Sequence, residues 1–179
     1  MRAVLDANVL FPTILREILT DLAQAGLYDA LWSDRILEEW RGAAARIDHD
    51  TASVAGAGIA MLRLRFPQAV QNDDGQATID LDFPDPADRH VVEAALSGRA
   101  SLIVTANLRD FPQRMMAGLG LRALHPDAFL LDLLARDRGA VLAALHAARD
   151  RAEAAGGAMS MGEMLKRCRL PRLARAVKG

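Results

Sequence analysis

Two short apolar runs dominate the hydrophobic pattern of this chain. Ala3–Leu5 lies almost at its start, and Leu102–Thr105 lies far downstream. Both runs are too short for a helix and are typical of strands that are buried on both faces of a parallel sheet. A weak alternation over Leu27–Trp32 predicts a short second strand, and Leu119–Leu124 is expected to form a last edge strand.

Apolar residues at helical spacing separate the predicted strands. A first helix follows Asp6 directly and ends at Gly26, which has the position of a helix C-cap. Ser33 or Asp34 is expected to cap a second helix over about 34–46. A third helix is expected from the low 50s to Arg65, before Pro67.

The middle of the chain is polar and then returns to helix and strand. Residues 67–86 are predicted to be mostly loop, with a short strand near Ile79–Leu81. Asp85-Pro-Ala-Asp88 opens a helix with a buried apolar stripe, which ends at Gly98 before the Leu102–Thr105 strand. Strands that alternate with helices predict an α/β sandwich with a mostly parallel central sheet.

The pattern becomes entirely helical from about Asp127. Helices are expected over 127–136, 138–155, 161–168 and 171–177, with a break at Gly156-Gly157. We therefore predict two parts, an α/β domain over residues 1–130 and a helical extension over residues 131–179.

Composition is that of an ordinary globular protein, with 51% hydrophobic and 25% charged residues and a formal net charge of −1. The single Cys168 excludes an internal disulfide and a cysteine-based zinc site, and it fits a reducing cytoplasm. Asp6 interrupts the apolar start too early for a signal peptide, and no apolar run is long enough to span a membrane. We expect a cytoplasmic protein without a membrane partner.

Charge is distributed unevenly along the chain. Residues 66–88 contain six Asp and no Lys or Arg, whereas residues 160–179 contain six basic residues against Glu163 alone. Two interpretations of the basic tail stay open: RNA contact, or solvated charges on a helical pair that Leu165, Leu170, Leu173 and Val177 attach to the domain. The six basic residues are Lys166, Arg167, Arg169, Arg172, Arg175 and Lys178.

Acidic residues occur where the predicted topology brings chain segments together. Asp6 ends the first strand, Asp88 opens the helix before the Leu102–Thr105 strand, and Asp110 follows that strand. Strand ends and helix starts share one edge of a parallel sheet, where open α/β sheets place their ligands. Glu38 and Glu39 lie on the second helix.

Several carboxylates in one cleft would repel one another unless a cation neutralised them. Oxygen ligands without Cys or His at metal spacing select a hard ion such as Mg²⁺ or Mn²⁺, which suits hydrolysis of a phosphodiester. Each acid also has a local explanation. Asp6 and Asp88 stand where an aspartate can cap a helix, and Asp110 stands where one can stabilise a turn. Glu38 and Glu39 can be ordinary charges on the surface of a helix.

Four segments together resemble the PIN-domain family of metal-dependent ribonucleases. They are Val4-Leu-Asp6-Ala-Asn8-Val-Leu, Ser33-Asp-Arg-Ile-Leu-Glu38-Glu39-Trp40, Asp85-Pro-Ala-Asp88-Arg-His-Val-Val-Glu-Ala-Ala95 and Ile103-Val-Thr105-Ala-Asn107-Leu-Arg-Asp110-Phe111. The resemblance covers roughly residues 1–130 and is greatest to VapC-like toxins of toxin–antitoxin pairs, in a longer variant with C-terminal helices. It implies a PIN-like three-layer α/β/α sandwich.

The resemblance also implies a site. Asp6, Glu39, Asp88 and Asp110 would form a catalytic site that holds Mg²⁺ or Mn²⁺, with Glu38 as an alternative to Glu39. Asn8, Thr105 and Asn107 would position these ligands or the substrate. Arg89 and Arg109 are candidates for contact with phosphate, whereas His90 turns about 100° away from Asp88 on a helix and is not expected to be a ligand.

The resemblance further implies endoribonuclease cleavage by metal-assisted attack of water, and as partners RNA, an antitoxin protein and a second copy of the chain. The alternative is a PIN fold without catalysis that binds RNA or regulates. Other phosphate-handling classes fit poorly. Asn8 replaces the second Asp of a haloacid-dehalogenase-type phosphatase, the only lysines lie in the tail, and neither a dinucleotide-binding glycine pattern nor a P-loop is present.

Overall fold

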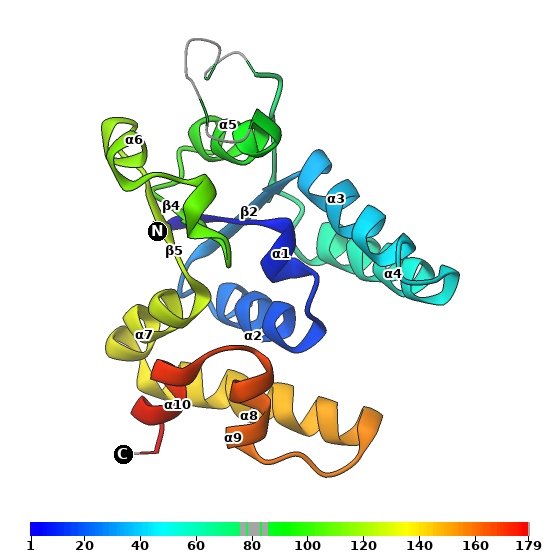
Figure 1. Ribbon diagram of the computed structural model, residues 1–179. Helices are drawn as coiled ribbons and strands as arrows, with labels where there is room; N and C mark the ends of the chain where they lie inside the picture. The colour runs from blue at the N-terminus through cyan, green and yellow to red at the C-terminus, as the bar shows by residue number, and fades with distance from the viewer. Residues whose placement is uncertain (76–77, 79–82, 84–85, 179) are drawn as a thin grey trace.

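The computed structural model describes residues 1–75, 78, 83 and 86–178. Five parallel strands form its sheet in the order β3-β2-β1-β4-β5 (Figure 1). Their bounds are Arg2–Leu5 (β1), Asp29–Ser33 (β2), Val70–Gln71 (β3), Leu102–Val104 (β4) and Arg122–Leu124 (β5).

The strand that begins the chain lies in the middle of the sheet. Val4 is in register with Leu31 of β2 on one side and with Ile103 of β4 on the other. Ala3, Val4 and Leu5 are fully buried. This position confirms that the first apolar run is a strand covered on both faces, because only a central strand has neighbours in all four directions.

Two strands differ from their predicted extent. β2 starts at Asp29 because Gly26, at a φ of +81°, ends the preceding helix; the Leu27 amide donates to the Leu22 carbonyl at 3.1 Å. β5 starts only at Arg122 because helix α6 (Gln113–Gly118), which the sequence did not predict, precedes it. β3 was also missed, and the strand expected near Ile79–Leu81 lies outside the described residues.

Helices cover both faces of the sheet. Helix α5 (Arg89–Ser97) packs against β1, β2 and β4 on one face, whereas α2 (Thr13–Gln24) and α7 (Pro126–Arg136) lie on the other (Figure 1). The edge-to-face contact between Tyr28 and Phe129, with ring centroids 4.9 Å apart, joins α7 to the segment before β2. The layers confirm the predicted α/β/α sandwich.

The helices around the future site begin at polar side chains. The short helix α1 (Ala7–Leu10) follows β1 directly, and α3 (Asp34–Ala45) starts at Ser33, whose hydroxyl accepts from the Ile36 amide at 3.2 Å. Helix α4 (His49–Arg65) begins earlier than predicted because Asp48 accepts from the Thr51 amide at 2.6 Å. Helices α3 and α4 pack together beyond β2 (Figure 1).

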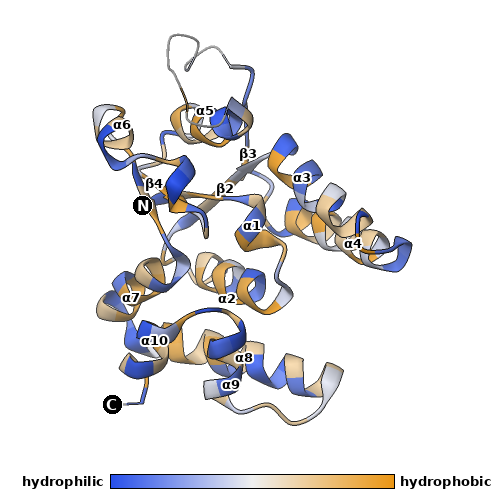
Figure 2. Cartoon of the chain, viewed as in Figure 1, coloured by the Kyte–Doolittle hydropathy of each residue, from blue (hydrophilic) through white to orange (hydrophobic). Residues whose placement is uncertain are grey.

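The C-terminal helices form an additional layer against α2 and α7. They are α8 (Arg138–Gly156), α9 (Met161–Arg167) and α10 (Pro171–Ala176), close to their predicted bounds. Residues of α7 are largely hydrophobic, whereas α10 alternates between hydrophilic and hydrophobic residues (Figure 2). Leu165, Leu170 and Leu173 are fully buried, so the tail is attached to the domain by its leucines as one interpretation expected. The domain boundary at residue 130 stays a prediction.

Within the described residues, no helix combines the length and the apolar character that a membrane crossing requires.

Candidate active site

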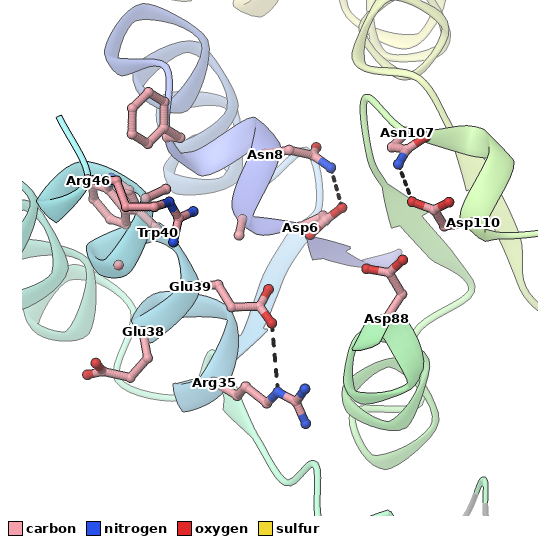
Figure 3. Close-up of a pocket in the computed structure, with 14 residues that line it drawn as sticks. Asp6, Asn8, Arg35, Glu38, Glu39, Trp40, Arg46, Asp88, Asn107 and Asp110 are labelled. Carbon is pink, nitrogen blue, oxygen red and sulfur yellow. Dashed lines mark hydrogen bonds and ion pairs between the residues drawn. The ribbon is translucent and has the colours of Figure 1, made fainter. Parts of the chain in front are cut away.

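One pocket of about 700 Å³ lies at the carboxyl edge of the sheet, between α1, α3, α5 and the loop after β4 (Figure 3). All four predicted acids of the site line it, namely Asp6, Glu39, Asp88 and Asp110. The topology explains the convergence, because Asp6 follows β1 and Asp110 follows the neighbouring β4, while α3 and α5 start at the same edge.

Asp6 is the most buried acid of the pocket, with 5% of its surface exposed. Its Oδ2 accepts from the Thr105 hydroxyl at 2.7 Å and from the Asn8 amide at 2.5 Å. Asn8 Oδ1 in turn accepts from the Ala106 amide at 2.9 Å. Asp6 has the N-cap position of α1 but makes no side-chain cap bond there, so the capping interpretation is wrong. Asn8 and Thr105 thus orient its carboxylate toward the pocket.

The electrostatic environment resists ionisation of Asp6. Burial raises the pKa of its carboxyl above the ordinary value, and the Glu39 carboxylate raises this pKa further. The hydrogen bond from Thr105 and the charge of His90 act in the opposite direction but do not compensate. A buried acid with a raised pKa beside a second acid is an arrangement that a bound cation would relieve.

Of the two adjacent glutamates, only Glu39 faces the other acids. Its carboxylate points toward Asp6 and Asp88, whereas Glu38 points away from them (Figure 3). Glu38 also lines the pocket, but it is exposed and forms an ion pair with Arg41 at 2.7 Å. The structure therefore favours Glu39 over Glu38 as the helical member of the acidic group.

Asp88 and Asp110 approach the pocket from the side opposite α3 (Figure 3). Asp88 has the N-cap position of α5, yet its side chain makes no cap bond to the helix. Asp110 ends a short 3₁₀ helix (Leu108–Asp110), where the Asn107 amide donates to its Oδ2. The Asn107 backbone amide donates to the Thr105 hydroxyl at 3.0 Å, which fixes the start of the segment that follows β4.

His90 has a role that sequence reasoning missed. Its Nδ1 lies 2.6 Å from the Ala87 carbonyl and must donate to it, while Nε2 lies 3.2 Å from Glu39 Oε1. His90 is 2% exposed, and its Nε2 approaches the Glu39 carboxylate from within the fold without forming a hydrogen bond to it. The two-residue spacing of Asp88 and His90 on a helix argued against His90 as a metal ligand. It gave no signal that His90 would contact Glu39 on α3.

The arginines that line the pocket are not Arg89 and Arg109, the two predicted to contact phosphate. Arg35 and Arg46, both on or next to α3, contribute to its walls. Arg35 Nε lies 3.7 Å from Glu39 Oε1. Neither candidate lines the pocket: the Arg89 guanidinium lies over the Phe83 ring, 5.5 Å from its centroid, and Arg109 is exposed on the 3₁₀ helix. Their contact with phosphate stays a prediction.

The basic tail is separate from the pocket. Helices α9 and α10 lie across α2 from α3 and α5 (Figure 1), and none of the six basic residues lines the pocket. RNA contact by this tail stays a prediction.

The donor set fits a hard metal ion. Five carboxylates, Glu38 included, and two amide side chains line the pocket, and oxygen donors of this kind suit Mg²⁺ or Mn²⁺. In the described part of the chain, no three acidic, histidine or cysteine side chains stand close enough together to ligate one ion directly. Mg²⁺ keeps several waters and uses only one or two carboxylates, so the spacing is compatible with a hydrated ion.

The fold and the acidic pocket agree with the family that the sequence comparison identifies. The chain belongs to the PIN domain family, whose sequence profile matches residues 2–109. A curated relative named "Putative ribonuclease VapC50", from Mycobacterium tuberculosis (strain ATCC 25618 / H37Rv), is 53% identical to this chain over 47 residues. That match spans 26% of this chain and 28% of the relative, well under two thirds of its length. No solved structure matches the chain significantly.

Proposed function

We propose that this protein is a metal-dependent endoribonuclease that hydrolyses RNA phosphodiesters with water. The observation that carries the proposal is the convergence of Asp6, Glu39, Asp88 and Asp110 on one pocket in a PIN domain. The name of the relative, a ribonuclease, agrees with this assignment.

The acids have distinct tasks in the proposed reaction. Asp6, Glu39, Asp88 and Asp110 would hold Mg²⁺ or Mn²⁺, which when bound supplies an acidified water and withdraws charge from the scissile phosphate. Thr105 and Asn8 fix the Asp6 carboxylate, and Asn107 fixes that of Asp110, while His90 lies beside that of Glu39. Such support for ligands typically changes metal affinity or activity by about 10- to 100-fold.

The decisive experiment is cleavage of a generic single-stranded RNA by purified protein with Mg²⁺, with Mn²⁺ and with EDTA. We expect cleavage only with metal, and a loss on the order of 10²–10³-fold in Asp6→Asn. Asp132→Asn is the matched control, because Asp132 is exposed on α7 and does not line the pocket. Cleavage by Asp6→Asn at the wild-type rate would contradict the proposed metal site.

One observation favours the catalytically silent alternative, an RNA-binding or regulatory PIN fold. The acids of the described residues do not converge as three direct ligands. Metal titration distinguishes the two functions: a silent module shows RNA binding without cleavage under any divalent ion, whereas the nuclease gains cleavage as metal is added.

We further propose a biological role as the toxin of a toxin–antitoxin pair in the cytoplasm, with an antitoxin protein that blocks the pocket and a homodimer as the active form. The VapC part of the relative's name supports this role. Induced expression should arrest growth with wild-type protein but not with Asp6→Asn. A small DNA-binding protein encoded by the adjacent gene should relieve the arrest. Growth arrest by Asp6→Asn would argue against RNA cleavage as the cause.

A further inference from the structure

We propose that the acidic pocket continues into a nucleobase-binding pocket formed by Phe11, Trp40, Gly42, Ala43 and Arg46. One unstacked base of a single-stranded RNA would enter it, next to the phosphate that lies at the carboxylates. This inference rests on the proposed function and extends it to how the substrate is held.

The cavity is larger than a metal site needs. A divalent ion with six waters occupies on the order of 200 Å³, from about 30 Å³ for each water. The pocket measures about 700 Å³, within the range of sites that bind small organic ligands. Most of its volume is therefore left for a substrate group other than the reacting phosphate.

The remaining volume is lined by apolar side chains at one end. Phe11 and the α3 residues Trp40, Gly42 and Ala43 line the same pocket as the acids. Figure 3 shows Trp40 and Arg46 on the opposite side of Glu39 from Asp88 and Asp110. An apolar end beside a charged end matches a nucleotide, because the base is flat and apolar on its faces while the phosphate is charged.

Gly42 keeps the wall of this end open. Glycine inside a helix costs about 0.5–1 kcal/mol relative to alanine. Packing does not require it here, since a Cβ at Gly42 would meet only Arg46 Nη1, at 3.9 Å. By contrast, a Cβ at Gly58 would come within 2.8 Å of Trp40 Cη2, so glycine is needed there for packing. Because Gly42 lines the pocket, a larger side chain at this position would extend into the open space there.

The walls of the proposed base pocket are preformed. Trp40 is 3% exposed, and its ring is fixed by the Arg16 guanidinium, 4.4 Å from its centroid, and by the close approach of Gly58. Arg16 is fixed by its donation to the Leu10 carbonyl at 2.6 Å. Rigid walls reduce the ordering that binding would otherwise require.

Arg46 supplies a cation at the mouth of this end. It is exposed, and no acid among the described residues lies within ion-pair distance of it. It stands seven residues after Glu39, which places it about 10 Å along the helix from that acid and on the same side. An arginine plane beside an unpaired base adds stacking, and its charge attracts the neighbouring phosphate.

The test combines a filled pocket with a missing base. Gly42→Leu fills the apolar end without touching an acid, and abasic nucleotides placed on either side of the cleaved bond remove the base. For wild type, one of the two abasic RNAs should lower kcat/KM by about 5- to 100-fold, as loss of one stacked base does. For Gly42→Leu, kcat/KM on intact RNA should be lower than that of wild type by a similar factor. Removal of the base should lower the kcat/KM of this variant no further.

Gly56→Leu is the matched control, because a Cβ at Gly56 on α4 would meet no atom within 4 Å and Gly56 does not line the pocket. It should cut like wild type, and thermal melting should show both variants folded. Wild-type cleavage of intact RNA by Gly42→Leu, or indifference of wild type to both abasic RNAs, would overturn the proposal while leaving the nuclease function in place.

A binding assay separates the two possible failures. With Mg²⁺ present, calorimetry compares AMP, GMP, CMP and UMP with ribose 5-phosphate, which lacks the base. At least one nucleotide should bind wild type 5-fold or more tightly than ribose 5-phosphate does, and this preference should vanish in Gly42→Leu. A preference without any RNA cleavage would support the base pocket and count against the nuclease; equal binding of all probes would count against the base pocket.

Discussion

The acidic pocket and the C-terminal helical layer use charge in opposite ways. In the pocket, Asp6, Glu39, Asp88 and Asp110 gather with like charge, and the pKa of Asp6 is raised as a result of burial and of Glu39. Where α8 of the C-terminal layer meets α2, charges are matched: Arg151 pairs with Glu17 at 2.7 Å and with Asp21 at 2.6 Å. Like charges held together at a cost in stability point to a ligand, whereas matched charges serve the fold.

A buried aspartate shows the structural use most clearly. Asp127 is 4% exposed, close to the value of Asp6, yet its two oxygens accept from the Arg172 amide at 3.0 Å and the Leu173 amide at 2.9 Å. These amides start α10, so Asp127 attaches the tail to the domain. Burial alone does not identify a functional acid; the partners of the carboxylate do.

The largest expected effect separates the two adjacent glutamates. Glu39→Gln should lower RNA cleavage by on the order of 10²-fold, because the variant loses a charge that faces Asp6 and Asp88. Glu38→Gln removes a charge that is paired with Arg41 on the surface and should stay within a few-fold of wild type. Equal losses in the two variants would show that both acids act, and a loss in Glu38→Gln alone would reverse the assignment.

The next effect tests the structural aspartate. Asp127→Ala leaves the two α10 amides without their acceptor and should lower the free energy of unfolding by about 2–4 kcal/mol. Chemical denaturation measures this loss, and RNA cleavage at low temperature should persist. Asp132→Ala on the same helix is the control and should change stability by no more than about 0.5 kcal/mol. A stable Asp127→Ala would mean that the tail is attached by its leucines alone.

Asp6→Asn should change stability by a smaller amount than Asp127→Ala does, and should raise it instead of lowering it. Without metal, this variant should melt about 2–4 °C higher than wild type, the shift that ~1 kcal/mol produces in a chain of this size. The reason is that it removes a buried charge whose pKa the fold raises. Mg²⁺ should then raise the melting temperature of wild type but not that of the variant. A lower melting temperature for Asp6→Asn would make Asp6 a structural acid like Asp127.

The smallest effect concerns the pH dependence of the start of α7. His125 Nδ1 accepts from the Asp127 amide at 3.2 Å, which requires the unprotonated ring. Burial lowers the pKa of His125 below its usual value near 6.5, so the unfolded chain takes up a proton before the folded chain does. The His125 cap therefore contributes fully to the free energy of unfolding above about pH 6.5. This contribution is lost as the pH falls from the pKa of His125 in the unfolded chain to its lower pKa in the folded chain.

His125→Asn keeps an acceptor at the helix start and does not titrate. Between about pH 7 and pH 5, wild type should lose up to ~1 kcal/mol relative to this variant, the typical contribution of a helix cap. Urea denaturation at each pH measures the difference. His146→Asn, on the exposed side of α8, is the control and should follow wild type. Parallel curves for wild type and His125→Asn would exclude a contribution of this cap.

Much of the fold and the outline of the site could be predicted because the signals are local. Ala3–Leu5 and Leu102–Thr105 are apolar runs that only a covered strand tolerates, and Asp6 follows the first of them directly. Gly26 and Ser33 end and start helices through bonds within their own segments. The interpretation of Leu165, Leu170 and Leu173 as the attachment of the tail was also confirmed.

What the sequence left open depends on contacts between distant segments. Residues 6 and 105 meet across the sheet, and so do His90 and Glu39, from α5 to α3. The choice between Glu38 and Glu39 follows from the rotation of α3 against the sheet edge, which no local pattern encodes (Figure 3). The same rotation brings Arg35 and Arg46 to the pocket.

Apart from β3 and α6, the amino-acid sequence by itself determined the order of strands and helices and the acids that follow the strands, because buried runs and helix ends are set by neighbours in the chain. The tertiary structure alone decided which side chains face one another in the pocket. Their directions depend on how helices pack on the sheet, and packing is a property of segments that meet only after folding.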